Sequence, residues 1–196
     1  MPSYDTVLIQ NGTNDSNEYG IIHGNNKIVL IKAGANGSYR GYNDRYLLMA
    51  DWLHKNYGCT VICASNPDKN SFAAADRAVI SRYIAEHHPE PCEYSYFGVS
   101  NGAYQGLVIA TEYFQFKKMV MVNMPLFLNW HKIKNKLTEH APLSITMVYG
   151  DRDPSFPYLP LLDRYRSETL DIRIIEGADH RFSERQEAFI NLRELI

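Results

Sequence analysis

Gly98-Val99-Ser100-Asn101-Gly102 is the stretch of sequence that decides the fold. It follows the apolar run Tyr94-Ser95-Tyr96-Phe97, which is typical of a strand, and it precedes residues 103–113, which are typical of a helix. A serine with glycines two positions before and after it, on a strand-to-helix turn, sits on a sharp bend with its hydroxyl exposed. The glycines are needed because backbone segments approach too closely there for a Cβ atom. The stretch therefore predicts that Ser100 is a nucleophile, provided that the chain also supplies a base, an acid and an oxyanion hole.

Strands and helices alternate on both sides of this turn. The apolar run Ile28-Val29-Leu30-Ile31 indicates a strand buried on both faces, which is typical of a parallel sheet covered by helices. We expect strands at 4–10, 19–23, 27–32, 60–64, 93–97, 119–123, 143–149 and 171–175. We expect helices at 42–57, 71–88, 103–114, 158–167 and 182–196. This order predicts an α/β protein with one domain over residues 1–196, built as a three-layer αβα sandwich around a mostly parallel sheet.

Composition is that of a soluble globular chain and argues against a nucleic-acid role. The chain has 196 residues, of which 45% are hydrophobic and 21% charged, with a formal net charge of −2. Neither a basic run nor a strong net charge favours nucleic acid or an anionic membrane surface as a partner. The first residues lack a signal-peptide pattern and no apolar run is long enough to span a bilayer, so we expect a cytoplasmic location. The three cysteines show no disulfide framework or zinc-ligand spacing, so we expect free thiols and no metal.

A base and an acid for Ser100 are expected after later strands, because ligand sites in such sheets lie beyond the carboxyl ends of the strands. Among seven histidines, His180 alone lies in a loop directly after an expected strand and before the last helix. The segment Gly150-Asp151-Arg152-Asp153 follows another expected strand, and both of its carboxylates are available. A serine hydroxyl needs a base to take its proton, and the base needs a third group to orient it.

An oxyanion hole requires two backbone N–H groups directed at one point. One comes from the residue after the nucleophile, Asn101. The second is expected from a glycine-rich loop after an early strand, and Ala33-Gly34-Ala35-Asn36-Gly37 is such a loop.

The chain carries, in this order, the glycine-rich loop, Ser100, the acid and His180. In this order of sites it resembles the α/β-hydrolase superfamily along essentially its whole length. The resemblance implies an eight-stranded sheet, in agreement with the strands expected above, and catalysis without a metal or an organic cofactor. The family's Gly-x-x-Asp pattern selects Asp153 over Asp151 as the acid. By position, the N–H groups of Ala35 and Asn101 would form the oxyanion hole, although Ala33-Gly34 stands where the family usually has His-Gly.

The expected activity is that of a serine hydrolase that cleaves a carboxylic ester or thioester of a small molecule through an acyl-enzyme. Two alternatives stay open: an acyltransferase or lyase using the same triad, and a non-catalytic binding protein on the same fold. The connection 124–142 is too short for a helical cap domain, so we expect an open site. Four apolar side chains near the site either line a substrate pocket or pack onto the core: Leu126, Phe127, Trp130 and Phe156.

Overall fold

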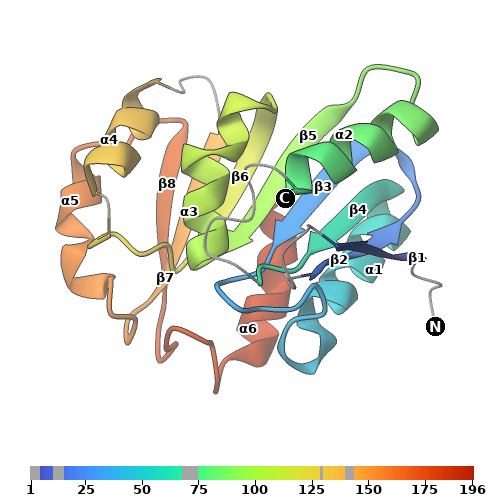
Figure 1. Cartoon of the computed structure of the whole chain (residues 1–196). Helices are drawn as coiled ribbons and strands as arrows, with labels where there is room; N and C mark the ends of the chain where they lie inside the picture. The colour runs from blue at the N-terminus through green and yellow to red at the C-terminus, as the bar shows by residue number, and fades with distance from the viewer. Residues whose placement is uncertain (1–4, 11–15, 68–74, 129, 140–143) are drawn as a thin grey trace.

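One mixed sheet runs through the molecule. The structure is a computed structural model that describes residues 5–10, 16–67, 75–128, 130–139 and 144–196. Eight strands are found in these ranges (Figure 1): β1 (Asp5–Gln10), β2 (Ser16–Ile22), β3 (Asn25–Lys32), β4 (Cys59–Ala64), β5 (Glu93–Val99), β6 (Phe116–Val122), β7 (Ser144–Gly150) and β8 (Leu170–Ile175). Their order across the sheet is β1-β2-β4-β3-β5-β6-β7-β8. β2 runs antiparallel to β1 and β4, and every other pair is parallel.

Helices cover both faces of this sheet (Figure 1). One face carries α1 (Arg45–Tyr57) and α6 (Gln186–Asn191), and the other carries α2 (Ala75–His87), α3 (Asn101–Val108), α4 (Trp130–Glu139) and the single turn α5 (Pro160–Asp163). Neighbouring strand residues point to opposite faces, so Tyr96 packs in the core under α2 and α3 while Phe97 packs under α1 and α6. The three-layer α/β fold expected from the sequence is confirmed.

The central strands are buried, which explains why their sequences are continuous apolar runs. Every residue of β4 is buried, and so are the last five residues of β3. Helices on both faces exclude water from these strands, so polar alternation is absent. None of the described helices combines the length and the apolar character that crossing a bilayer requires.

Several expected helices differ from the observed ones. A helix was expected over 158–167, but the chain forms a 3₁₀ turn at Phe156–Tyr158 and then only α5. Pro160 explains where α5 begins, because proline lacks an N–H and is favoured at the first helical position. After Asp163 the chain continues in single turns, in which the N–H of Tyr165 donates to Leu162 at 2.8 Å and that of Arg166 to Asp163 at 3.2 Å. The last helix was expected from residue 182, yet α6 begins at Gln186, because Phe182 has a positive φ of 55°. The expected starts at residues 4, 71 and 143 lie outside the described residues.

Helix α4 was not expected. It holds ten residues of the β6–β7 connection and packs against α3. Ile133 is buried, while Trp130 and Leu137 pack against the same core from the same side of the helix. The described part of this connection therefore adds a helix to the outer layer of the sandwich rather than a cap domain over the sheet.

Candidate active site

Ser100 lies on the tight turn between β5 and α3. Its φ of 52° and ψ of −119° are unusual for a residue other than glycine, and a conformation of this kind costs about 1–3 kcal/mol. Both flanking glycines are required by space. A Cβ atom on Gly98 would lie 2.6 Å from the Cα of Ala103, and one on Gly102 would lie 2.4 Å from the carbonyl oxygen of Ala33. The turn therefore holds the Ser100 side chain at the carboxyl edge of the sheet.

The three residues expected to form a triad lie in one chain of hydrogen bonds. Ser100 Oγ lies 2.9 Å from Nε2 of His180, and Nδ1 of His180 lies 2.5 Å from Oδ2 of Asp153. The Asp153 side chain is fully buried, whereas 40% of the His180 side chain is exposed. An ionised carboxylate only accepts, so Nδ1–H donates to Asp153 and leaves Nε2 as an acceptor for the serine hydroxyl.

The two aspartates after β7 have different partners. Oδ1 of Asp153 accepts the backbone N–H of Ser155 at 2.6 Å, which fixes the carboxylate facing His180. Asp151 instead accepts the backbone N–H of Gly177 at 2.8 Å. The structure therefore places Asp153 next to His180, while Asp151 connects the loop after β7 to the loop after β8 that carries His180.

The loop around His180 is also fixed from within. Oδ1 of Asp179 accepts the N–H groups of Arg181 at 3.1 Å and Ser183 at 2.8 Å. These donors, Ser183 foremost, hold the pKa of Asp179 below its ordinary value. Asp179 thus shapes the loop, and its neighbour His180 faces Ser100.

Asn123, at the end of β6, is a site residue that sequence reasoning missed. It is fully buried with a positive φ of 48°. Its Nδ2 donates to the carbonyl oxygens of Asp179 at 3.2 Å and His180 at 3.1 Å, and its Oδ1 accepts the N–H of Gly150 at 3.0 Å. The sequence signal that could have identified Asn123 was its position directly after four apolar residues, 119–122.

The glycine-rich loop after β3 lies against Ser100. The N–H of Gly37 donates to the carbonyl of Gly34 at 2.9 Å, which closes a turn with Ala35 and Asn36 at its centre. A Cβ atom on Gly34 would lie 3.3 Å from that of Ser100, so the two segments touch. Ala35, the next residue in this turn, lines the same cleft as Ser100, and its role in an oxyanion hole stays a prediction.

Asn101 occupies the corresponding place on the other side. It is the first residue of α3, and the first N–H groups of a helix lack intrahelical acceptors. Its N–H is therefore available for a ligand at Ser100.

Asn66, two residues beyond β4, joins the glycine-rich loop to the nucleophile turn. Its Nδ2 lies 3.1 Å from the carbonyl oxygen of Ala33 and 3.0 Å from Oδ1 of Asn101. Its backbone also pairs with the loop, since its N–H donates to Gly37 and its carbonyl accepts from Asn36, both at 2.8 Å. One buried side chain thus contacts both segments that would supply the oxyanion hole.

Comparison with solved structures finds the same arrangement of strands and helices in several proteins. An alpha-beta serine hydrolase homologue from Coxiella burnetii matches with a TM-score of 0.69 at 17% identity, over 96% of this chain and 95% of that chain. Est1E from Butyrivibrio proteoclasticus matches with a TM-score of 0.71 at 10% identity, over 96% of each chain. XC6422 from Xanthomonas campestris, an α/β serine hydrolase without lid, matches with a TM-score of 0.67 at 14% identity, over 97% of this chain and 92% of that chain.

The chain has the α/β-hydrolase fold. No protein-family model matches it, and no curated protein matches its sequence. The fold is therefore established by structure rather than by sequence similarity.

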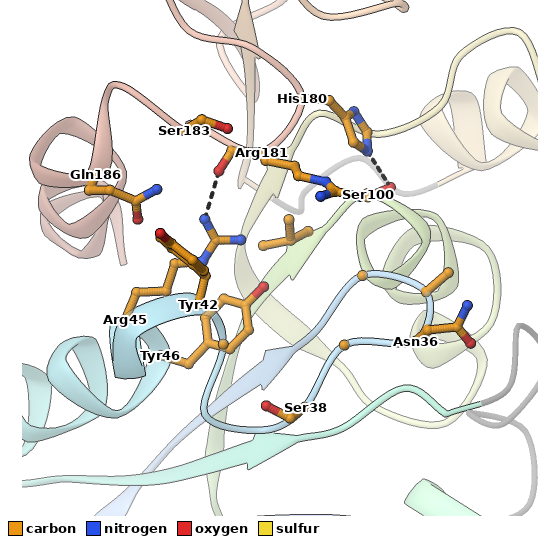
Figure 2. A pocket seen from close by; sticks show the side chains of 15 residues that line it. Asn36, Ser38, Tyr42, Arg45, Tyr46, Ser100, His180, Arg181, Ser183 and Gln186 are labelled. Carbon is orange, nitrogen blue, oxygen red and sulfur yellow. Dashed lines mark hydrogen bonds between the residues drawn. The ribbon is translucent and has the colours of Figure 1, made fainter.

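In this α/β-hydrolase fold a cleft of about 730 Å³ opens beside Ser100 and His180. Its walls are the glycine-rich loop, the start of α1 and the loop after His180 (Figure 2). The larger side chains that line it are Tyr42, Arg45, Tyr46, Arg181 and Gln186. In the described part of the chain, no three His, Cys, Asp or Glu side chains are grouped as ligands for a metal ion.

The four apolar side chains considered for a substrate pocket lie elsewhere. Leu126 is fully buried in the core under α3 and α4, and Trp130 and Phe156 pack against that same core. Phe127 is 49% exposed and its ring contacts Tyr158. None of the four is among the described residues that line the cleft. The sequence left pocket lining and core packing open, and for Leu126, Trp130 and Phe156 the structure shows packing.

Proposed function

We propose that this protein is a serine hydrolase that cleaves the carboxylic ester or thioester of a small molecule through an acyl-enzyme. The observation that carries the proposal is the continuous chain from Ser100 Oγ to His180 at 2.9 Å and on to Asp153 at 2.5 Å. It stands at an open cleft, on a fold shared with esterases and serine hydrolases.

In the proposed reaction, Ser100 Oγ attacks the carbonyl carbon of the substrate while His180 Nε2 takes its proton. Asp153 keeps the imidazole oriented and stabilises its charged form. The N–H groups of Ala35 and Asn101 stabilise the oxyanion of the tetrahedral intermediate. His180 then donates the proton to the departing alcohol or thiol, which leaves an ester of Ser100.

Deacylation repeats these roles with water as the nucleophile. His180 takes a proton from water, which attacks the acyl carbonyl, and then returns it to Ser100 as the carboxylic acid leaves. The exposure of the His180 side chain supports water over a dedicated acceptor, because a transferase must keep water away from its acyl-enzyme.

Replacement of Ser100 by alanine tests the proposal. We expect Ser100→Ala to lose turnover of para-nitrophenyl and thioester substrates by about 10⁴-fold or more, and to lose labelling by a fluorophosphonate probe. Ser167→Ala is the matched control, because that hydroxyl lies at the surface near Thr169 and should not affect either readout. Wild-type turnover in Ser100→Ala, or no labelling of the wild type at Ser100, would refute the assignment.

A further inference from the structure

A buried arginine faces the cleft beside Ser100. Arg45, the first residue of α1, is only 8% exposed, yet its side chain lines the cleft (Figure 2). One guanidinium nitrogen donates to the carbonyl of Arg181 at 2.9 Å, and the guanidinium carbon lies 4.0 Å from the ring centre of Phe189. Its Nε is buried without a hydrogen-bond partner, and no carboxylate of the described residues pairs with it.

A buried cation without a counterion is costly to fold. One carbonyl, the rings of Phe189 and Tyr46 at 4.0 and 5.3 Å, and the Tyr46 hydroxyl compensate only part of the lost hydration. A guanidinium also offers five donors in a planar fork that matches the oxygens of a carboxylate or phosphate. Arg45 therefore retains capacity for an anion supplied from outside the chain.

A second guanidinium lies in the same cleft. Arg181 directly follows His180, and in Figure 2 its side chain extends across the cleft in the direction of Ser100. It is exposed, and it forms no ion pair with the described residues. Two cations thus face one space at the candidate nucleophile.

Acidic side chains do not neutralise this pair. The described residues that line the cleft include no aspartate or glutamate. The carboxylates on the adjoining segments have other partners: Asp44 pairs with Arg40, Asp179 accepts backbone N–H groups, and Glu184 lies 3.7 Å from Arg152. The rest of the lining mixes polar side chains with glycines, Ala35, Val99 and two tyrosines, so the two guanidiniums are its only charged groups among the described residues apart from His180 when protonated.

We propose that the substrate carries a carboxylate or phosphate group, which Arg45 and Arg181 bind while its ester or thioester carbonyl lies at Ser100. This inference rests on the proposed hydrolase function and names its substrate class. Binding of the anion would neutralise the buried guanidinium and would place the carbonyl between Ser100 and the N–H groups of the oxyanion hole.

The test compares kcat/KM for para-nitrophenyl hemiglutarate with that for para-nitrophenyl valerate, a neutral ester of similar length. We expect the wild type to prefer the anionic ester by about tenfold or more, and Arg181→Gln and Arg45→Gln each to lower that ratio by about tenfold. Lys117→Gln removes one positive charge at the opposite end of the sheet, where Lys117 pairs with Glu93, and should leave the ratio unchanged. If Arg45→Gln does not fold, Arg181→Gln carries the comparison because its side chain is exposed.

Anion binding is also measured without catalysis, by calorimetric titration of Ser100→Ala with glutarate and with inorganic phosphate. Tighter binding of one of the two identifies the anion, and its loss in the Ser100→Ala, Arg181→Gln double variant supports the inference. Two results would overturn the inference but not the proposed hydrolase function. The first is equal kcat/KM for both esters in an enzyme that the fluorophosphonate labels, and the second is a kcat/KM ratio that neither arginine variant changes. Absence of labelling and of all ester hydrolysis overturns the proposed function instead.

Discussion

Replacing Asn66 by alanine tests whether the oxyanion hole depends on one buried side chain. The change removes the hydrogen bonds from Nδ2 to Ala33 at 3.1 Å and to Asn101 at 3.0 Å, together with a longer and weaker one from Gln105 Nε2 to Oδ1 at 3.4 Å, and it leaves the backbone bonds of residue 66 in place. Each neutral hydrogen bond contributes about 1 kcal/mol, so the free energy of unfolding should fall by about 2 kcal/mol. For a chain of this size the melting temperature should fall by about 4–8 °C.

The effect on catalysis should exceed what this loss of stability explains. Asn66 Nδ2 links the carbonyl of Ala33, just before the turn at Ala35, to the side chain of Asn101. Without it the Ala33 segment loses this link, whereas Asn101 keeps a hydrogen bond from Gln105 at 2.9 Å. Removing one oxyanion donor outright lowers kcat by about 10²–10³-fold, so displacing one should lower it by about 10–100-fold. KM should change by less than about threefold, because these donors act mainly in the transition state.

The assay is steady-state hydrolysis of a para-nitrophenyl ester well below the melting temperature of the variant. Asn56→Ala is the control, since that exposed asparagine also donates to a backbone carbonyl, of Trp52 at 2.8 Å, near the end of α1. It should leave kcat unchanged. A kcat of Asn66→Ala within twofold of the wild type, with the expected fall in melting temperature, would show that Asn66 stabilises the fold without positioning the oxyanion hole.

Three further substitutions test the packing, the buried charge and the acid response of the site. In Gly102→Ala, the new Cβ would meet the carbonyl oxygen of Ala33 at 2.4 Å, so we expect a loss of about 1–3 kcal/mol in urea unfolding and weak fluorophosphonate labelling; wild-type labelling would contradict this. In Asp76→Asn, the buried ammonium of Lys32 loses its carboxylate, so unfolding free energy should fall by about 3–5 kcal/mol. Because Asp76 also accepts the buried Tyr19 hydroxyl, a Tyr19→Phe, Lys32→Met, Asp76→Leu triple variant should recover most of that loss. Backbone donors lower the pKa of Asp179, so its carboxylate stabilises the fold above its unfolded pKa of about 3.9, and that contribution is lost as pH falls through the lower folded value. Chemical unfolding from pH 6 to pH 2 should therefore show a steeper loss for the wild type than for Asp179→Asn, and parallel curves would contradict this.

The triad residues could be found from sequence because a parallel sheet brings distant strand ends to one edge. Ser100 and His180 are separated by 80 positions, yet Ser100 directly follows β5, His180 lies in the loop after β8, and the strand order places both at the same edge. Asp151 and Asp153 both follow β7, and in the sequence only the Gly-x-x-Asp pattern of the family that the chain resembles selects Asp153. The backbone of the loop after β7 gives the physical reason, because it turns the Asp153 carboxylate to His180 and that of Asp151 to Gly177.

The cleft could not be found in the same way. Apolar residues after a strand satisfy either a pocket or a core, and Leu126 packs in the core. Arg45 shows the converse case, since an arginine at the start of a helix is ordinarily a solvated surface residue. Its burial depends on tertiary packing against Phe189, far along the chain, which no local pattern contains.

The asparagines that follow β4 and β6 explain why the site depends on the whole centre of the sheet. Asn66 reaches across β3 to the nucleophile turn after β5, and Asn123 reaches from β6 to the loops after β7 and β8. Each amide therefore fixes a loop that belongs to a different strand from its own. The distance between Ser100 and His180 is consequently set by the order and register of six neighbouring strands rather than by either loop alone. Substitutions at these two asparagines should therefore alter catalysis, although neither side chain belongs to the proposed triad.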